Sequence, residues 1–200
     1  PDAVFQGNDG LILLFSKTHQ SIFRWDPATQ SYAGTIPLVK NPTFATYSPS
    51  LNRIYTGLPS GEIRMMDLNA ASPVDAPFYN LPSSVLGMTA AGDFLFAVDA
   101  SGAWESHYVI SSSGALLSSE EWRTDSRVFE WSPVNSKVYH FRDGSSPNDL
   151  IQTPISAQGI LGEDVDSPYH GGVGTVPPIR VAGDGSVVVL GSGEVFNGTT

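Results

Sequence analysis

One pattern recurs along this chain at a nearly constant interval: a polar turn rich in Gly, Asn, Asp and Ser, followed at once by a short apolar segment. The apolar segments cover residues 11–15, 53–56, 94–98, 137–141 and 186–190. The matched positions Ile12, Ile54, Phe96 and Val138 are each 42 residues apart, and the match to Val189 follows after 51. Equal spacing over three steps indicates repeated structural units.

Each repeat contains further segments of strand length, rich in β-branched and aromatic residues and bounded by Gly, Pro, Asn and Asp. First strands are expected at residues 44–47, 85–88, 128–131 and 179–181; third strands at 22–25, 63–66 and 108–110; and fourth strands at 32–36, 76–81, 115–122 and 160–164. No segment has a sustained helical period with caps at its ends. Four strands in about 40 residues predict an all-β chain, a β-propeller of four-stranded antiparallel blades.

The expected blades cover residues 1–40, 41–83, 84–126 and 127–175, and a partial fifth covers 176–200. A sandwich, the rival all-β fold, would not predict equal spacing. Either a five-bladed ring closes with a three-stranded blade, or the chain is a slice of a larger ring. We favour the slice, and we expect neighbouring blades or domains in a longer protein, since no initiator methionine precedes Pro1.

Two stretches resemble blades of the YVTN-type and NHL-like propellers of the WD-repeat-like superfamily, residues 48–67 and 23–37. The shared features are a Ser-Pro turn before a strand and a later strand that ends in an Asp-containing turn. The YVTN tetrapeptide itself is absent. Trp25-Asp26 occupies the place of the WD dipeptide, but other blades carry Met66-Asp67 and Ile110-Ser111 there, so we interpret it as a coincidence.

Composition excludes several classes of function. The net charge is −10, from 20 acidic and 10 basic residues, which disfavours nucleic acid as a partner. There is no cysteine, so disulfides, thiolate metal sites and a cysteine nucleophile are excluded. No apolar run approaches the roughly 20 residues of a membrane helix, so no membrane insertion is expected. Low lysine content and abundant Ser, Thr and Gly favour an extracellular, cell-surface or periplasmic protein of bacterial type.

In a propeller, the loops between strands two and three and those between blades emerge on one face around the central channel. Binding residues usually lie on such loops. The candidate ligand-binding residues on this face are His19, Trp104, Arg123, Asp125, Arg127, Tyr169 and His170. Trp104 and Tyr169, with Trp122 and Trp131, offer rings on which a sugar or peptide can stack. The two arginines offer bidentate contacts to a carboxylate, or pair within their own loop.

Metal binding is the less favoured interpretation of the polar loops. Asp143, Asn148 and Asp149 supply oxygen ligands suited to calcium, as do Glu163, Asp164 and Asp166, but neither group matches the EF-hand pattern. No two of the four histidines have the spacing of zinc ligands. His107 and His140 are expected to be packed, hydrogen-bonded strand residues.

Two hypotheses of function remain open. The first is a non-catalytic binding or scaffolding module that recognises a protein, peptide or glycan on the loop face, without a cofactor other than a possible calcium ion. The second is a propeller enzyme, a lactonase-like hydrolase or a quinoprotein-like oxidoreductase, with its site at the channel mouth. No serine-hydrolase elbow or phosphate-binding loop is present, so we favour binding.

Overall fold

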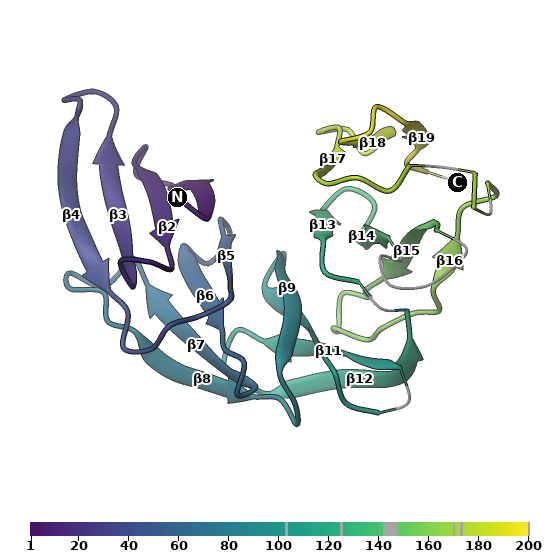
Figure 1. The fold of residues 1–200 in the computed structure, drawn as a ribbon, viewed down its shortest axis with the longest axis horizontal. Coiled ribbons are helices and arrows are strands. Elements are labelled where there is room, and N and C mark those ends of the chain that lie inside the picture. Colours follow the sequence, from purple (N-terminus) through teal and green to yellow (C-terminus); the bar gives the residue numbers. More distant parts are fainter. Residues whose placement is uncertain (103, 125, 142–147, 170, 173, 200) are drawn as a thin grey trace. The chain divides into compact units, whose positions relative to one another are not determined.

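The computed structural model describes the whole chain except residues 103, 125, 142–147, 170, 173 and 200 (Figure 1). Its described residues form nineteen strands and no helix, in five antiparallel sheets. Four sheets have four strands and the last has three, and within each sheet consecutive strands are neighbours. The prediction of four four-stranded blades and a partial fifth is confirmed. The described residues include no helix long and apolar enough to cross a membrane.

The chain divides into two compact units, the first of which, Pro1–Val85, contains blades 1 and 2. Blade 1 consists of β1 (Ala3–Gln6), β2 (Ile12–Ser16), β3 (Ser21–Asp26) and β4 (Ser31–Pro37). Blade 2 consists of β5 (Phe44–Ser48), β6 (Arg53–Gly57), β7 (Glu62–Asp67) and β8 (Ala76–Asn80).

The second unit, Leu86–Thr200, contains blades 3 to 5 apart from Val85, the first residue of β9. Blade 3 consists of β9 (Val85–Ala91), β10 (Phe94–Asp99), β11 (Glu105–Ser111) and β12 (Leu116–Arg123). Blade 4 consists of β13 (Phe129–Ser132), β14 (Lys137–Phe141), β15 (Leu150–Pro154) and β16 (Val165–Asp166). Blade 5 consists of β17 (Ile179–Val181), β18 (Val187–Leu190) and β19 (Val195–Asn197).

The hairpin between the first two strands of each blade depends on a residue with a left-handed backbone. Gly10, Asn52 and Ser136 occupy this place in blades 1, 2 and 4, and glycines occupy the equivalent turns of blades 3 and 5. Glycine and asparagine tolerate this conformation best. The polar turns that precede each apolar segment in the sequence are therefore the turns that this geometry requires.

Apolar side chains from adjacent blades meet within each unit. In the first unit, Leu13 and Phe15 of blade 1 pack in one core with Tyr47, Ile54 and Met66 of blade 2. The second unit has two such cores. One joins blades 3 and 4, with Phe96, Val98, Val109, Val138 and Leu161 among its members; the other joins blades 4 and 5, with Tyr139, Phe141, Ile179, Val188 and Leu190. Each sheet thus buries apolar surface against a neighbouring sheet, as stacked blades must.

Two details of the predicted pattern are wrong. Val188, and not Val189, takes the buried position that Val138 has in blade 4, because Val189 is 39% exposed and Val188 is fully buried. The fourth strand of blade 4 was expected at residues 160–164, but β16 follows that segment. There Leu161 instead forms an isolated bridge with Ile155 and packs into the core.

Candidate functional site

A β-bulge lies near the end of the outermost hairpin of blade 3. Glu105 pairs with Arg123 and His107 pairs with Glu120, so two residues of β12, Glu121 and Trp122, oppose one residue of β11. The backbone of Trp122 has a φ of 62°. Bulges redirect side chains at strand ends. In this one, Trp122 is 65% exposed while the next residue, Arg123, is buried.

A second exposed tryptophan lies beside the bulge. Trp104, just before β11, is 72% exposed and has a φ of 85°. Its ring meets the ring of Trp122 edge to face, with centroids 5.9 Å apart and an interplanar angle of 65°. We call these two residues the Trp pair. Two bulky side chains in left-handed conformation, both directed into solvent, carry backbone strain that no burial of their rings offsets.

Carboxylates flank the Trp pair. Glu120 and Glu121 immediately precede Trp122, and both are exposed. The side chain of Glu121 lies against Gly102 in the loop that carries Trp104, since a Cβ atom at Gly102 would be 3.2 Å from Glu121 Cγ. The surface therefore combines two aromatic rings with negative charge.

The two arginines predicted to bind a ligand carboxylate contact carboxylates of this chain. Arg123 Nη1 lies 2.8 Å from Asp164 Oδ1, and its Nη2 donates to the Gly162 carbonyl at 3.0 Å. Arg127 forms an ion pair with Glu105, which also accepts from the backbone amide of Ser126 at 3.2 Å. These contacts join blade 3 to blade 4 and to the segment between them.

Inside this junction lies a group of polar side chains that the sequence did not bring together. His107 of β11, His140 of β14 and Asp164 each place one nitrogen or oxygen within 4.8 Å of the others. We call these three residues the His cluster. Both histidines are fully buried, and the side chain of Asp164 is 16% exposed. The two imidazole centroids are 5.5 Å apart.

His140 is hydrogen-bonded on both ring nitrogens. Nδ1 lies 2.8 Å from Ser126 Oγ, and Nε2 lies 3.0 Å from Thr153 Oγ1. Thr153 in turn donates to Asp164 Oδ1 at 2.6 Å. His140 was expected to be a packed, hydrogen-bonded strand residue, and its contacts match that expectation.

His107 is packed but differs in its hydrogen bonding. Neither ring nitrogen has a hydrogen-bond partner among the described residues. Its ring lies edge-on to Phe96 and Phe129, at 5.1 and 6.4 Å between centroids. Burial lowers the pKa of His107 well below its usual 6.5, and the charges of His140 and Arg123 lower it further, against a weaker opposing interaction with the Thr124 backbone.

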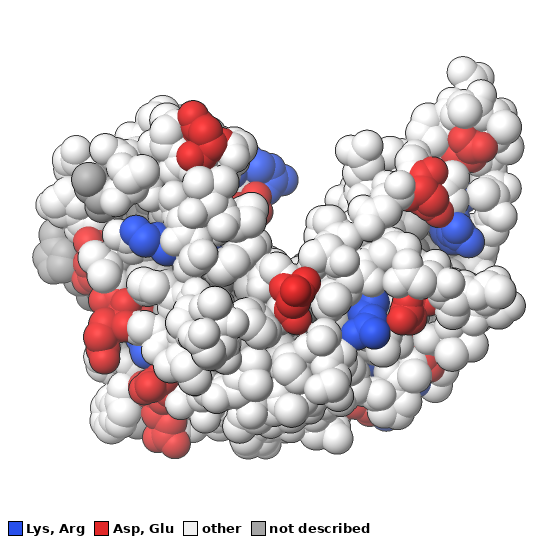
Figure 2. Space-filling model, turned by 180° about the vertical axis from the view of Figure 1, so that it is seen from behind, with Lys and Arg blue, Asp and Glu red and all other residues white. Residues whose placement is uncertain are grey.

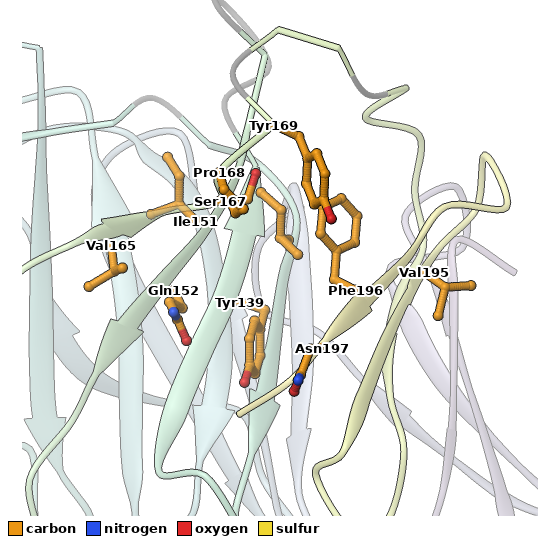
Figure 3. A pocket seen from close by; sticks show the side chains of 11 residues that line it. Tyr139, Ile151, Gln152, Val165, Ser167, Pro168, Tyr169, Val195, Phe196 and Asn197 are labelled. Atoms are coloured by element: carbon orange, nitrogen blue, oxygen red, sulfur yellow. The ribbon is translucent and has the colours of Figure 1, made fainter. Parts of the chain in front are cut away.

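Tyr169 lies at a different place, over a small cavity between blades 4 and 5 (Figure 3). Its ring is 60% exposed and packs edge-on against Phe196 at 5.9 Å. The cavity is about 120 Å³ and is lined by side chains of both blades, among them Tyr139, Gln152 and Val195. Figure 3 shows the Tyr169 ring beside that of Phe196, and both rings line the cavity.

Of the calcium candidates in the loop between β14 and β15, the structure describes Asn148 and Asp149, and these two make separate contacts. Asp149 is buried and accepts from Ser167 Oγ at 2.9 Å, whereas Asn148 is exposed and its carbonyl accepts from the Gly171 amide at 3.1 Å. His19 belongs to the first unit, where it contacts Ser16 at 3.0 Å and the ring of Phe23. The remaining predicted site residues, Asp125, Asp143 and His170, lie outside the described residues.

The His cluster escaped sequence reasoning because its members come from three strands or loops of two blades. His107 and His140 are 33 residues apart, so no local spacing relates them. The repeat register contains the missing information. Val98 pairs with His107, and His140 stands 42 residues after Val98, so the two histidines occupy neighbouring positions in adjacent blades.

On the face of the molecule that Figure 2 shows, acidic and basic side chains lie at several separate places among uncharged ones; the sequence holds 20 acidic and 10 basic residues. A surface of this charge attracts cationic partners over the range of a Debye length.

Comparison with known proteins shows the fold. No protein-family model and no curated protein sequence matches this chain. Among solved structures, hydrazine synthase of Kuenenia stuttgartiensis is similar, with a TM-score of 0.71 and 17% identity over 94% of this chain and 54% of that one. Virginiamycin B lyase of Staphylococcus aureus has a TM-score of 0.66 and 16% identity over 96% and 64%, and the RRP9 WD40 repeats have 0.61 and 12% over 82% and 49%.

These neighbours include WD40 repeats and a propeller lyase, and the chain therefore has a β-propeller fold. It spans between about half and two thirds of the length of those three structures. Identities below 20% establish architecture only, and propellers carry many unrelated activities. Any function must be argued from the residues of this chain.

Proposed function

We propose that this propeller chain is a protein-binding module and that the Trp pair, with Glu120 and Glu121, is its ligand-contacting surface. The observation that carries the proposal is the exposure of two contacting tryptophans, at 72% and 65%, on left-handed backbone. Tryptophan is the residue most enriched among those that dominate binding energy in protein interfaces. Backbone strain at exposed aromatic residues does not help the chain to fold, because their rings are not buried. Binding of a ligand by these rings explains why the strain is kept.

The charge around the Trp pair favours a basic ligand. Lys and Arg side chains are attracted to the faces of tryptophan rings and to carboxylates, and both groups are present within a few residues here. The net charge of −10 adds a long-range attraction for a cationic segment. The proposed ligand is therefore a Lys- or Arg-containing segment of a partner protein.

The test uses peptides of defined charge. Fluorophore-labelled protein is applied to an array of basic, acidic and neutral peptides, and the dissociation constant of the best binder is then measured by calorimetry. We expect basic peptides to dominate, and Trp104→Ala or Trp122→Ala to weaken binding about 10-fold or more. Tyr32→Ala is the matched control, because Tyr32 is a 61% exposed aromatic residue of blade 1.

Two results would overturn the proposal. One is an unchanged affinity when both tryptophans are replaced by alanine. The other is preferential binding of neutral oligosaccharides, tested with the same proteins, because a glycan gains nothing specific from Glu120 and Glu121. If Tyr32→Ala weakens peptide binding as much as the tryptophan variants do, the loss of affinity comes from removing any exposed ring and is not specific to the Trp pair.

A further inference from the structure

The buried His cluster in the junction of blades 3 and 4 has a property that the proposed binding surface does not use. His107 is fully buried, and neither ring nitrogen forms a hydrogen bond of good geometry with a described residue; its one polar backbone contact, with Thr124, is weak. An unsatisfied buried polar group is destabilising, and native structures rarely keep one without a reason. One nitrogen of His140 and one carboxylate oxygen of Asp164 lie within 4.8 Å of a nitrogen of His107 and of each other.

The hydrogen bonds of His140 indicate which of its nitrogens has a lone pair. Ser126 Oγ donates its single proton to the Phe141 carbonyl at 2.8 Å, so it accepts from Nδ1–H of His140. The lone pair of the neutral ring is then on Nε2, directed toward Thr153. An acceptor on the far nitrogen fixes the tautomer and the ring orientation of a histidine, as the outer contacts of metal-ligating imidazoles do.

Thr153 has no proton left to donate to His140. Its hydroxyl proton is donated to Asp164 Oδ1, a carboxylate oxygen that can only accept. With neutral His140, two lone pairs face each other across the 3.0 Å between Nε2 and Thr153 Oγ1. A cation removes this conflict, and the two candidates are a proton on Nε2 and a metal ion. Only the metal ion also engages His107.

Asp164 is the third residue of the His cluster, and the cluster can be reached from solvent beside it. Arg123 holds the carboxylate at 2.8 Å, which fixes its orientation. Its side chain is partly exposed, so the cluster is reached from solvent at this residue. The guanidinium opposes a second positive charge nearby, and this favours metals that bind imidazole strongly over those held mainly by charge.

We propose that His107, His140 and Asp164 form a binding site for a divalent transition-metal ion, with Zn²⁺ the best match and water in a fourth position. Two imidazoles and a carboxylate are a common ligand set for zinc, whereas calcium requires oxygen ligands. Tetrahedral bonds of about 2.0–2.1 Å place ligand atoms roughly 3.4 Å apart. The separations of up to 4.8 Å must therefore shorten, with Nε2 leaving Thr153.

The test measures metal binding by the purified 200-residue chain after removal of metals with a chelator. Calorimetry with ZnCl₂ gives the affinity and stoichiometry, thermal melting gives the stabilisation, and visible absorption with Co²⁺ gives the coordination. We expect one Zn²⁺ per chain, a higher melting temperature with Zn²⁺, and the intense absorption bands of tetrahedral Co²⁺.

Variants separate this site from adventitious binding. His107→Phe removes one ligand and places an aromatic ring between Phe96 and Phe129, so we expect it to fold and to bind Zn²⁺ about 100-fold more weakly. Ser126→Ala removes the outer contact of His140 and is expected to weaken binding about 10-fold to 100-fold. His19→Phe, at an exposed histidine of the first unit, leaves the affinity unchanged.

If His107→Phe does not fold, Asp164→Asn replaces it as the variant that lacks one ligand. We expect Asp164→Asn to lower the Zn²⁺ affinity as well. Absence of Zn²⁺ binding by the unaltered chain up to millimolar concentration overturns the proposal. Equal Zn²⁺ affinities for the unaltered chain and His107→Phe also overturn it. Neither outcome touches the proposed role of the Trp pair.

Discussion

Residues with left-handed backbone fall into two groups in this chain. Among the described non-glycine residues, Gln20, Gln30, Asn52 and Ser136 lie in turns between strands, where a polar residue tolerates the conformation. Trp104 and Trp122 are the other two, and neither is a residue that turn chemistry selects. A positive φ costs a bulky residue about 1–2 kcal/mol. The strain at the Trp pair is therefore a departure from local rules, and such departures concentrate at functional sites.

Glu130 of β13 offers a prediction about pH. Burial raises the pKa of its carboxyl above the ordinary 4.5, and the Arg180 guanidinium partly opposes the shift. The folded chain therefore holds a proton that the unfolded chain releases, and stability falls as the pH rises from about 4.5 through the folded pKa. We expect Glu130→Gln to raise the melting temperature at pH 7 and to have no effect near pH 3.5.

The loss of the Arg180 contact in this variant matters little, because the pair is 3.5 Å apart and Arg180 is 67% exposed. Glu194→Gln is the control of opposite sign. Hydrogen bonds from Ser192 and the Gly174 amide lower the pKa of Glu194, so its replacement is expected to lower the melting temperature at neutral pH only. Equal shifts for Glu130→Gln at both pH values would contradict the explanation.

At the scale of the blade, an acidic residue recurs where the third strand begins. Glu62 opens β7, Glu105 opens β11, and Asp149 directly precedes β15. Each is bound by a side chain from a segment that joins two blades: Lys40, Arg127 and Ser167 respectively. The recurrence explains why Arg127, predicted to bind a foreign carboxylate, is occupied by one from its own chain. The sequence shows that Arg127 is a charged residue of a loop between blades, but it does not show which carboxylate this arginine pairs with.

Gly61, in the turn before β7, lies close to the segment that follows β8, and its replacement tests whether this close contact stabilises blade 2. Its φ is 87°, and a Cβ atom there would lie 2.5 and 2.6 Å from the carbonyl oxygens of Ser83 and Leu81. Backbone strain and this clash together predict that Gly61→Ala destabilises the chain by about 2 kcal/mol or more. Urea unfolding monitored by circular dichroism measures the loss.

Gly10→Ala is the matched control for Gly61→Ala. Gly10 has a similar φ of 82°, but nothing lies within 4 Å of an added Cβ atom. It bears the backbone strain alone, about 1 kcal/mol. If the two variants lose the same free energy of unfolding, the close approach of residues 81–83 to Gly61 does not affect stability, and the predicted clash is wrong.

For the whole molecule, the sequence predicted the architecture because repetition is visible without coordinates. Ile54, Phe96 and Val138 are fully buried strand residues, and Ile12 is a half-buried one beside the core residue Leu13. Prediction failed where the repeat lengthens. The mismatch of Val189 with Val188 and the shift of the last strand of blade 4 both come after β15, where residues 155–164 form an isolated bridge and no strand. It also failed for the His cluster, because contacts between blades depend on how sheets stack and not on sequence distance.

The charge of the whole chain predicts a dependence on salt. If a basic segment binds beside Glu120 and Glu121 on a molecule of net charge −10, salt screens the attraction. We expect the affinity for the best basic peptide to fall about 10-fold between 50 and 500 mM NaCl, mostly through slower association. Surface plasmon resonance resolves the two rates. A rate of association that is the same at both salt concentrations would contradict the electrostatic part of the proposal.

The measurement that tests the central claim most directly is the stability and the peptide affinity of one variant, Trp122→Gly. Glycine relieves the strain of a φ of 62°, and the ring that it removes is 65% exposed. If the Trp pair serves binding, this variant melts at the same or a higher temperature than the unaltered chain and binds the basic peptide about 10-fold or more weakly. A lower melting temperature with unchanged peptide affinity would show instead that Trp122 serves the fold.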